Sequence, residues 1–161
     1  MSPIQSMADD EECDLVRHLA EHGLSGERIV VEITEGVLLN ASPKVQERFD
    51  ELKKAKIQLA LDDFGTGYSS MSYLHKFDID YIKIDKSFVQ NLASNQGSRA
   101  ITETIIAMAH KLNKKVIAEG IETQHQLDYL IQAGCDYGQG YFYSEALPPQ
   151  EFLDFARSEL S

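Results

Sequence analysis

The sequence predicts a parallel α/β fold, in which short buried strands alternate with amphipathic helices. Five short runs are rich in Val, Ile and Tyr, helical patterns separate them, and each run ends in polar residues. The runs cover residues 28–35, 57–64, 80–87, 115–121 and 137–143. Their near-continuous apolar character is typical of parallel strands that are covered on both faces.

Helical patterns precede, separate and follow these runs. A first helix is expected around residues 15–19 and a last one over residues 149–160. Ser42 followed by Pro43 is typical of an N-cap with proline at the first helical position. This pair therefore predicts that a helix begins at Pro43 and continues to about Lys56.

Two further helices are expected in the second half of the chain. One covers residues 98–113, and its apolar face carries Ile101, Ile105, Met108, Ala109 and Leu112. Thr123 followed three residues later by Gln126 predicts a capping box at the start of the other. Gly134 is expected to end that helix, because glycine readily adopts the left-handed conformation of a C-cap.

Length and composition indicate one ordinary globular domain. The chain has 161 residues, of which 43% are apolar and 25% charged, enough for one hydrophobic core. Residues 1–10 are expected to be an irregular lead-in, and residues 11–161 to contain the β/α units. Cys13 and Cys135 match no zinc spacing, so two reduced thiols and a cytoplasmic location are expected.

Charge and hydropathy exclude two classes of partner. The formal net charge of −11 provides no basic surface for a DNA or RNA polymer. No apolar run approaches the roughly 20 residues that span a bilayer, so no membrane contact is expected. An anionic ligand would therefore depend on metal ions or on local hydrogen-bond donors.

Polar side chains cluster in the C-terminal half of each predicted strand or just beyond it. They are Glu32, Glu35, Asp62, Asp63, Lys83, Asp85, Glu119, Glu122 and Gln139. The carboxyl ends of parallel strands meet on one face of the fold, so these side chains are expected to lie close together. Glu32 and Lys83 are flanked by apolar residues inside their strands, which predicts a buried polar surface.

Several carboxylates with one lysine are typical of a site for a hard divalent cation. Two metal ions sharing a carboxylate would explain why Asp62 and Asp63 are adjacent, and this pattern favours hydrolysis of a phosphate ester. The alternative is that Glu35, Asp85 and Glu122 are simply solvated at wet strand ends. The five histidines show no ligand spacing and are interpreted as surface or hydrogen-bonded residues.

Five motifs carry a resemblance to a known family. VEITE, DDFGTGYSS with MSYL, YIKIDKSFV, VIAEGIET and GQGYFYS resemble, in this order and spacing, the EAL family of cyclic di-GMP phosphodiesterases. The resemblance implies a (β/α)₈ TIM-type barrel in which one strand runs antiparallel. It also implies hydrolysis of cyclic di-GMP to pGpG with Mg²⁺ or Mn²⁺ bound at two sites.

The resemblance further implies a role for the polar residues at the strand ends. Glu32, Asp62, Asp63 and Glu119 are expected to be metal ligands, with Asp62 shared between the two metals. Lys83 is expected to contact the attacking water. Glu119 lies at the metal and water cluster, so Lys83 and Glu119 are the expected catalytic residues.

Three more residues match supporting positions of the family motifs. Glu35 is expected to anchor the loop over residues 63–70, which in the family couples metal and substrate binding to dimerisation. Glu122 is expected to support a metal ligand without binding metal itself. Gln139 matches a glutamine at the end of the site.

The family pattern is incomplete in this sequence. A barrel of this type needs on the order of 200 to 250 residues and eight strands, whereas five strands are predicted here. The Glu-Ala-Leu strand and the following asparagine-bearing strand, each with a metal ligand, are not found. A barrel N-terminally truncated to about five parallel strands is therefore expected, with weakened metal sites. The unpaired edge of strand 28–35 predicts a homodimer or a higher oligomer.

Two hypotheses about function follow. In the first, the chain is the C-terminal portion of an EAL-type phosphodiesterase domain and is inactive by itself. In the second, it is a naturally shortened, non-catalytic module that binds cyclic di-GMP or another protein. The presence of Asp62, Asp63, Lys83 and Glu119 favours the first hypothesis. An unrelated metal-dependent barrel hydrolase is disfavoured by the five motifs in order.

Overall fold

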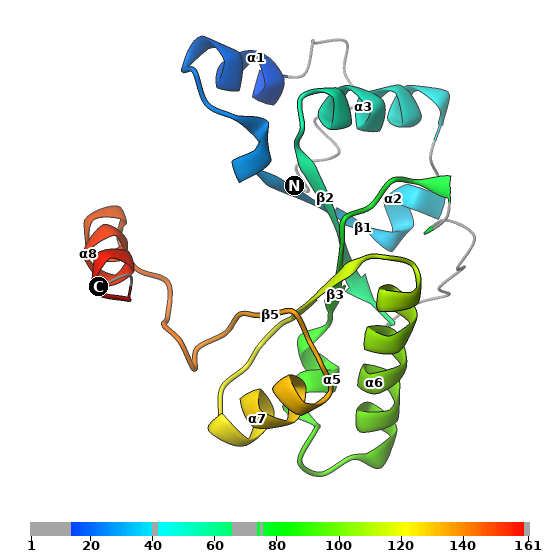
Figure 1. Ribbon diagram of the computed structural model, residues 1–161, viewed down its shortest axis with the longest axis vertical. Helices are drawn as coiled ribbons and strands as arrows, with labels where there is room; N and C mark the ends of the chain where they lie inside the picture. The colour runs from blue at the N-terminus through cyan, green and yellow to red at the C-terminus, as the bar shows by residue number, and fades with distance from the viewer. Residues whose placement is uncertain (1–13, 40–41, 66–73, 75, 160–161) are drawn as a thin grey trace.

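The computed structural model describes residues 14–39, 42–65, 74 and 76–159 (Figure 1). Its strands form one parallel sheet in chain order, which confirms the predicted fold class. They are β1 (Val30–Thr34), β2 (Gln58–Phe64), β3 (Tyr81–Ile84), β4 (Lys115–Ala118) and β5 (Tyr137–Gly138). Within the part of the chain that is described, β1 and β5 are edge strands, each with a single neighbour.

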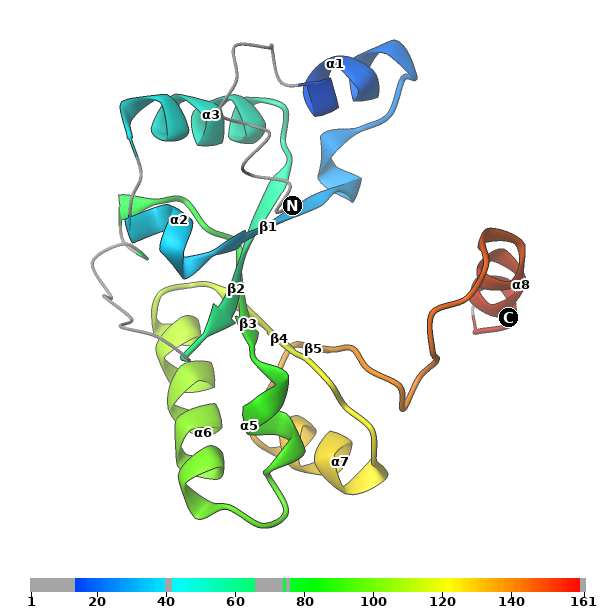
Figure 2. The same ribbon diagram turned by 180° about the vertical axis from the view of Figure 1, so that it is seen from behind.

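Seven α-helices and one 3₁₀-helix are found in the described residues. They are α1 (Asp14–Glu21), η2 (Gly26–Arg28), α2 (Glu35–Leu39), α3 (Pro43–Lys54), α5 (Lys86–Gln90), α6 (Gln96–Lys111), α7 (Gln124–Gln132) and α8 (Pro149–Glu159). The short elements η2, α2 and α5 were not predicted, since three to five residues are too few to show a helical period. Figures 1 and 2 show α5, α6 and α7 on one side of the molecule and α1 and α3 on the other.

Two of the predicted helix starts are confirmed in detail. The side chain of Ser42 accepts a hydrogen bond from the backbone N–H of Val45, and α3 begins at the proline. Thr123 and Gln126 form the predicted capping box at the start of α7. The chain leaves that helix at Gly134, whose φ is +83°.

The predicted apolar face of α6 is wrong at one position. Ile101 is 40% exposed, whereas Thr102 is fully buried. The buried residues of α6 are Ser98, Thr102, Ile105, Ile106 and Ala109. The buried face therefore begins with two small polar residues and continues with apolar ones. Hydrophobicity alone could not identify this start.

The two faces of the sheet differ sharply. The side chains that alternate onto one face are at most 1% exposed and belong to the hydrophobic core, which helices α3, α6 and α7 complete. They are Ile33, Leu59, Leu61, Ile82, Ile84, Val116 and Ala118. The strand register places the intervening residues, including Glu32 and Lys83, on the opposite face, because side chains alternate along a strand.

This second face is partly open to solvent. Val30 on β1 is 41% exposed and Tyr137 on β5 is 53% exposed. Helix α8 lies apart from the other helices, at the end of an extended segment (Figures 1 and 2), and its Phe152 is 57% exposed. On this face of the sheet, exposed apolar side chains at the two edge strands therefore flank the polar residues of the central strands.

Candidate metal and catalytic site

Lys83 lies at the centre of the polar cluster. It is in the middle of β3, and its side chain is only 2% exposed. Its Nζ lies 2.7 Å from Glu32 Oε1 on β1 and 3.0 Å from Asp62 Oδ1 on β2. It also lies 2.5 Å from Glu119 Oε1, just after β4. Burial of a charge requires partners, and four successive strands provide this lysine and its three carboxylates.

The fifth strand joins the cluster through Gln139, whose Nε2 donates to Glu119 Oε1 over 2.7 Å. A close approach of two backbones makes this contact geometrically possible. A Cβ added at Gly140 would lie 2.2 Å from the carbonyl oxygen of Ile121 and 2.3 Å from its nitrogen. Only glycine therefore lets the chain after β5 lie this close to the chain after β4.

The two adjacent aspartates reach the same site because β2 is irregular there. Consecutive residues of a regular strand point to opposite faces. The pairing of β2 with β3 shifts register between Leu61 and Phe64, and Asp63 has a φ of +56°. Bulges of this kind redirect side chains beside functional sites. As a result, Asp62, Asp63 and Glu119 each offer an oxygen within 4.8 Å of the others.

Burial and close charged partners act in opposite directions on the pKa values of the cluster. Burial lowers the pKa of Lys83, but hydrogen bonds and charges from its carboxylate neighbours outweigh it and raise that pKa above the ordinary value. Burial raises the pKa of Glu119, although Lys83 opposes the shift. Burial and the charge of Asp62 also raise the pKa of Asp63. One ammonium therefore faces a surplus of carboxylates.

These residues fit a hard divalent cation. Asp62 Oδ1 is buried, and among the described residues its close partner is an ammonium and not a neutral hydrogen-bond donor. Lys83 Nζ lies 3.0 Å away, so the charged neighbour of this oxygen is the buried ammonium. A buried carboxylate oxygen in an oxygen-only donor set is what Mg²⁺ and Mn²⁺ prefer.

Other residues predicted for the site lie outside this cluster. Glu122 Oε1 accepts from Gln90 Nε2 over 3.0 Å and is exposed. Asp85 caps α5, where its side chain accepts from the backbone N–H of Ser87. Glu35 is the half-buried first residue of α2, and most of its proposed loop partner lies outside the described residues.

A cavity of about 380 Å³ lies beside the cluster. Glu119, Gln139 and Glu122 reach it from the strand ends. The sequence reasoning missed its other lining residues, which are Lys86, Gln90, Gly120, Gly140, Tyr141 and Ser144. All of them follow β3, β4 or β5, so their position after the strands was the available signal.

Among the described residues, no helix is long and apolar enough to cross a membrane.

Comparisons with known proteins find similar sequences and similar solved structures. The cyclic di-GMP phosphodiesterase NbdA of Pseudomonas aeruginosa is 39% identical over 146 residues, which are 90% of this chain and 19% of NbdA. The solved PaMucR phosphodiesterase, in complex with c-di-GMP, is 32% identical with a TM-score of 0.79, covering 84% of this chain and 55% of that one. The manganese and cyclic di-GMP complex of Klebsiella pneumoniae BlrP1 is 30% identical with a TM-score of 0.74, covering 81% and 33%.

The chain matches only part of each relative. The chain spans about a fifth of the length of NbdA and about half of the PaMucR chain. Its five strands correspond to part of the TIM barrel of these domains. The family model of the EAL domain matches residues 1–146, and the chain therefore belongs to the EAL domain family.

Proposed function

We propose that residues 1–161 form the C-terminal portion of a single EAL domain that hydrolyses cyclic di-GMP to pGpG. The observation that carries this proposal is the buried ammonium of Lys83 among carboxylates from three neighbouring strands. The names of NbdA and of the PaMucR and BlrP1 complexes support the substrate. In this proposal Glu32, Asp62, Asp63 and Glu119 hold two divalent metal ions, Mg²⁺ or Mn²⁺.

The metal ions, when bound, would supply a hydroxide at neutral pH and neutralise charge on the phosphate. Lys83 would donate a hydrogen bond to the attacking water, because its ammonium lies among the carboxylates that would hold the metal ions. Gln139 would keep the carboxylate of Glu119 in one orientation through the contact at 2.7 Å. Glu35 would anchor the loop over residues 63–70, and Glu122 would steady the cavity wall through Gln90.

We expect no turnover by these 161 residues alone. The five strands form an open sheet, and the cluster faces solvent along β1, where the side chain of Glu32 is 50% exposed. Mg²⁺ requires near-octahedral coordination and gives up water reluctantly. An open site with few fixed ligands should therefore bind the metals weakly and position them poorly.

A binding module is the second candidate. The cavity of about 380 Å³ beside Glu119 and Gln139 favours retained binding of a ligand without turnover. The exposed side chains of Val30 and Tyr137 on the open face favour a second copy of the chain as a partner. A homodimer or higher oligomer in the cytoplasm is part of this proposal. Analytical ultracentrifugation tests it, and a monomer at 100 µM would overturn it.

Calorimetry followed by chromatography of the products tests the site. Wild-type chain, Asp62→Asn and Lys83→Met are titrated with Mn²⁺ and then with cyclic di-GMP, and pGpG is measured on the same samples. Asp128→Asn on α7, an exposed aspartate outside the cluster, is the matched control. We expect Asp62→Asn alone to weaken Mn²⁺ binding. Equal Mn²⁺ affinity in Asp62→Asn and Asp128→Asn would contradict the proposed metal site.

The cyclic di-GMP results separate the two functions. Ligand binding without product supports the binding module for this chain. Product formed by the wild type but not by Lys83→Met supports the catalytic assignment and overturns our expectation of inactivity. Product formed equally by both would overturn the role of Lys83.

A further inference from the structure

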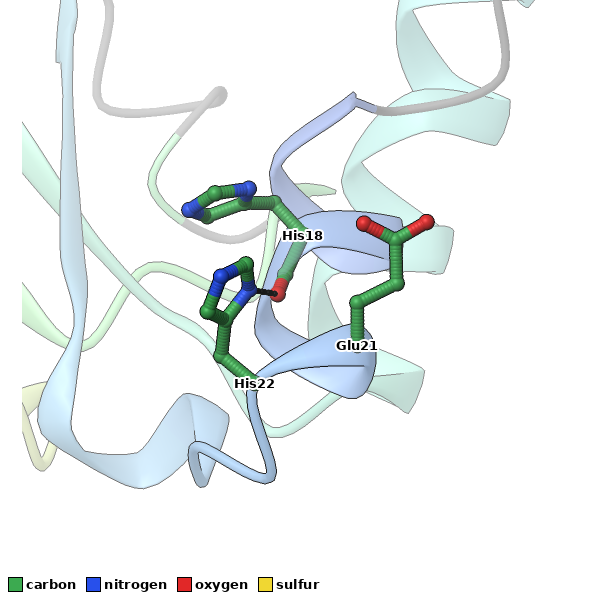
Figure 3. A group of neighbouring side chains, drawn as sticks. All are labelled: His18, Glu21 and His22. Carbon is green, nitrogen blue, oxygen red and sulfur yellow. Dashed lines mark hydrogen bonds between the residues drawn. The ribbon is translucent and has the colours of Figure 1, made fainter.

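A second group of metal-ligating side chains lies at the end of α1 and on the residue that follows it, outside the candidate site. His18, Glu21 and His22 each offer a ligand atom within 4.8 Å of the others, although the sequence analysis found no ligand spacing among the histidines. The spacing is that of one helical turn, and residues three and four apart share a helix face. Figure 3 shows the two imidazole rings next to each other, with the Glu21 carboxylate set apart from them across the helix.

The hydrogen bond of His22 presents its second nitrogen as a ligand. His22 Nδ1 lies 2.9 Å from the backbone oxygen of His18 (Figure 3). A carbonyl oxygen only accepts, so Nδ1 carries a proton, and in the neutral imidazole Nε2 is the nitrogen that can bind a metal ion. Metal-binding histidines characteristically donate their other ring N–H to a backbone carbonyl in this way.

The rings also lie close to each other. Their centroids are 4.2 Å apart, and the side chains of all three residues are exposed. Ligand atoms at 2.0–2.2 Å from one zinc ion are up to about 4 Å apart. Small rotations of exposed side chains would therefore bring the three atoms from their present separation to one ion.

The surroundings leave room for the remaining ligands. A cavity of about 420 Å³ is lined by Leu15, Arg17, His18 and Glu21, which is ample for water molecules. Arg17 Nε lies 4.0 Å from Glu21 Oε1, so the carboxylate has a competing partner and the two imidazoles must provide most of the affinity. Both residues of that ion pair are more than half exposed, which makes the competition weak.

We propose that His18, His22 and Glu21 form a binding site for a late first-row transition-metal ion, with Zn²⁺ as the expected ion. Imidazole nitrogens select such ions, whereas the carboxylates around Lys83 suit Mg²⁺ and Mn²⁺. The chain therefore has two metal sites of different selectivity. A bound ion would join His22 to the last turn of α1, a helix of eight residues that is too short to be stable by itself.

The affinity for Zn²⁺ tests the proposal on the full 161-residue chain, with excess Mg²⁺ present to occupy the carboxylates. We expect His18→Gln and His22→Gln each to weaken Zn²⁺ binding by roughly tenfold or more. Removing a group that only supports a metal ligand already costs about tenfold in affinity, so removing a ligand itself should cost at least as much. His125→Gln, an exposed histidine on α7, is the matched control and should leave the affinity unchanged. Equal affinity in all three variants would overturn the site.

Two spectroscopic readouts make the test independent of affinity. X-ray absorption of the zinc-loaded chain should show two imidazole ligands, and a spectrum with oxygen ligands alone would overturn the proposal. Hydrogen exchange in α1 should slow when Zn²⁺ is added to the wild type but not to the His18→Gln, His22→Gln double variant. Slowing that is equal in the two proteins would show that zinc acts elsewhere. Both histidines are exposed, so circular dichroism should confirm that the variants fold.

Discussion

The Lys83→Met substitution removes an ammonium that lies 2.5–3.0 Å from three carboxylate oxygens. Methionine has nearly the same length and fills the same buried space, so the change isolates the charge. Glu32, Asp62 and Glu119 would then face one another without a cation. Because like charges at short range repel, the folded state should lose stability at neutral pH.

The size of the loss follows from the exposure of the partners. The side chain of Glu32 is 50% exposed, so its pair contributes at most about 1 kcal/mol. Asp62 and Glu119 are 23% and 17% exposed. Breaking a fully buried pair costs about 3–5 kcal/mol, and partial solvation reduces this. We therefore expect Lys83→Met to lower the free energy of unfolding by about 2–4 kcal/mol at pH 7.5.

The pH dependence has a definite sign. The folded-state pKa of Lys83 is raised, so its contribution is fully present below the ordinary lysine pKa of about 10.4 and is lost as pH rises through the higher folded value. At pH 7.5 the wild type thus has the whole contribution. In the variant the carboxylates take up protons as pH falls, so its deficit should shrink toward pH 5.

Urea denaturation followed by circular dichroism measures both effects, since the chain has no tryptophan. Lys111→Met on α6, an exposed lysine, is the matched control and should change stability by less than about 0.5 kcal/mol. The same samples should bind Mn²⁺ at least as tightly after Lys83→Met, because the ammonium no longer competes for the carboxylates. A deficit below 1 kcal/mol, a deficit independent of pH or weaker Mn²⁺ binding would refute the reasoning.

Three further predictions concern the backbone and one tyrosine. Asp63→Ala should destabilise the fold by about 1–2 kcal/mol relative to Asp63→Asn, because asparagine tolerates the φ of +56° better than alanine does; equal melting temperatures would contradict this. Gly140→Ala should speed hydrogen exchange in β5, since its Cβ would meet the backbone of Ile121 at 2.2 Å, and unchanged exchange would exclude the clash. Burial and a hydrogen bond to Glu103 raise the pKa of Tyr129 to about 12. Absorbance at 295 nm should therefore show one late-titrating tyrosine, which is missing in Tyr129→Phe, and its stabilising contribution should be lost as pH rises through about 12.

Local patterns in the sequence were sufficient for much of the fold. Runs of Val, Ile and Tyr marked the starts of all five strands to within two residues, although the last run continued five residues beyond β5. The caps at Ser42 and Thr123 marked two helix starts. These features depend on neighbours in the chain, so a single sequence contains them. The row of polar residues at the strand ends was also visible, because parallel strands bring their carboxyl ends to one face.

The tertiary structure decided which of these polar residues contact one another and which do not. Lys83 lies among three carboxylates, whereas Glu122 turns away to Gln90. Their positions inside strands already set Glu32 and Lys83 apart, but the register between strands determines which side chains meet, and it leaves Glu32 half exposed.

The same reason explains the two aspartates and the histidines at the end of α1. Asp62 and Asp63 share a site only because the ladder between β2 and β3 shifts register, and that shift depends on residues about twenty positions away. The ligand geometry of His18 and His22 depends on how their side chains rotate on the helix surface. Periodicity and capping are properties of the local chain, whereas convergence of side chains is a property of strands and turns that meet only after folding.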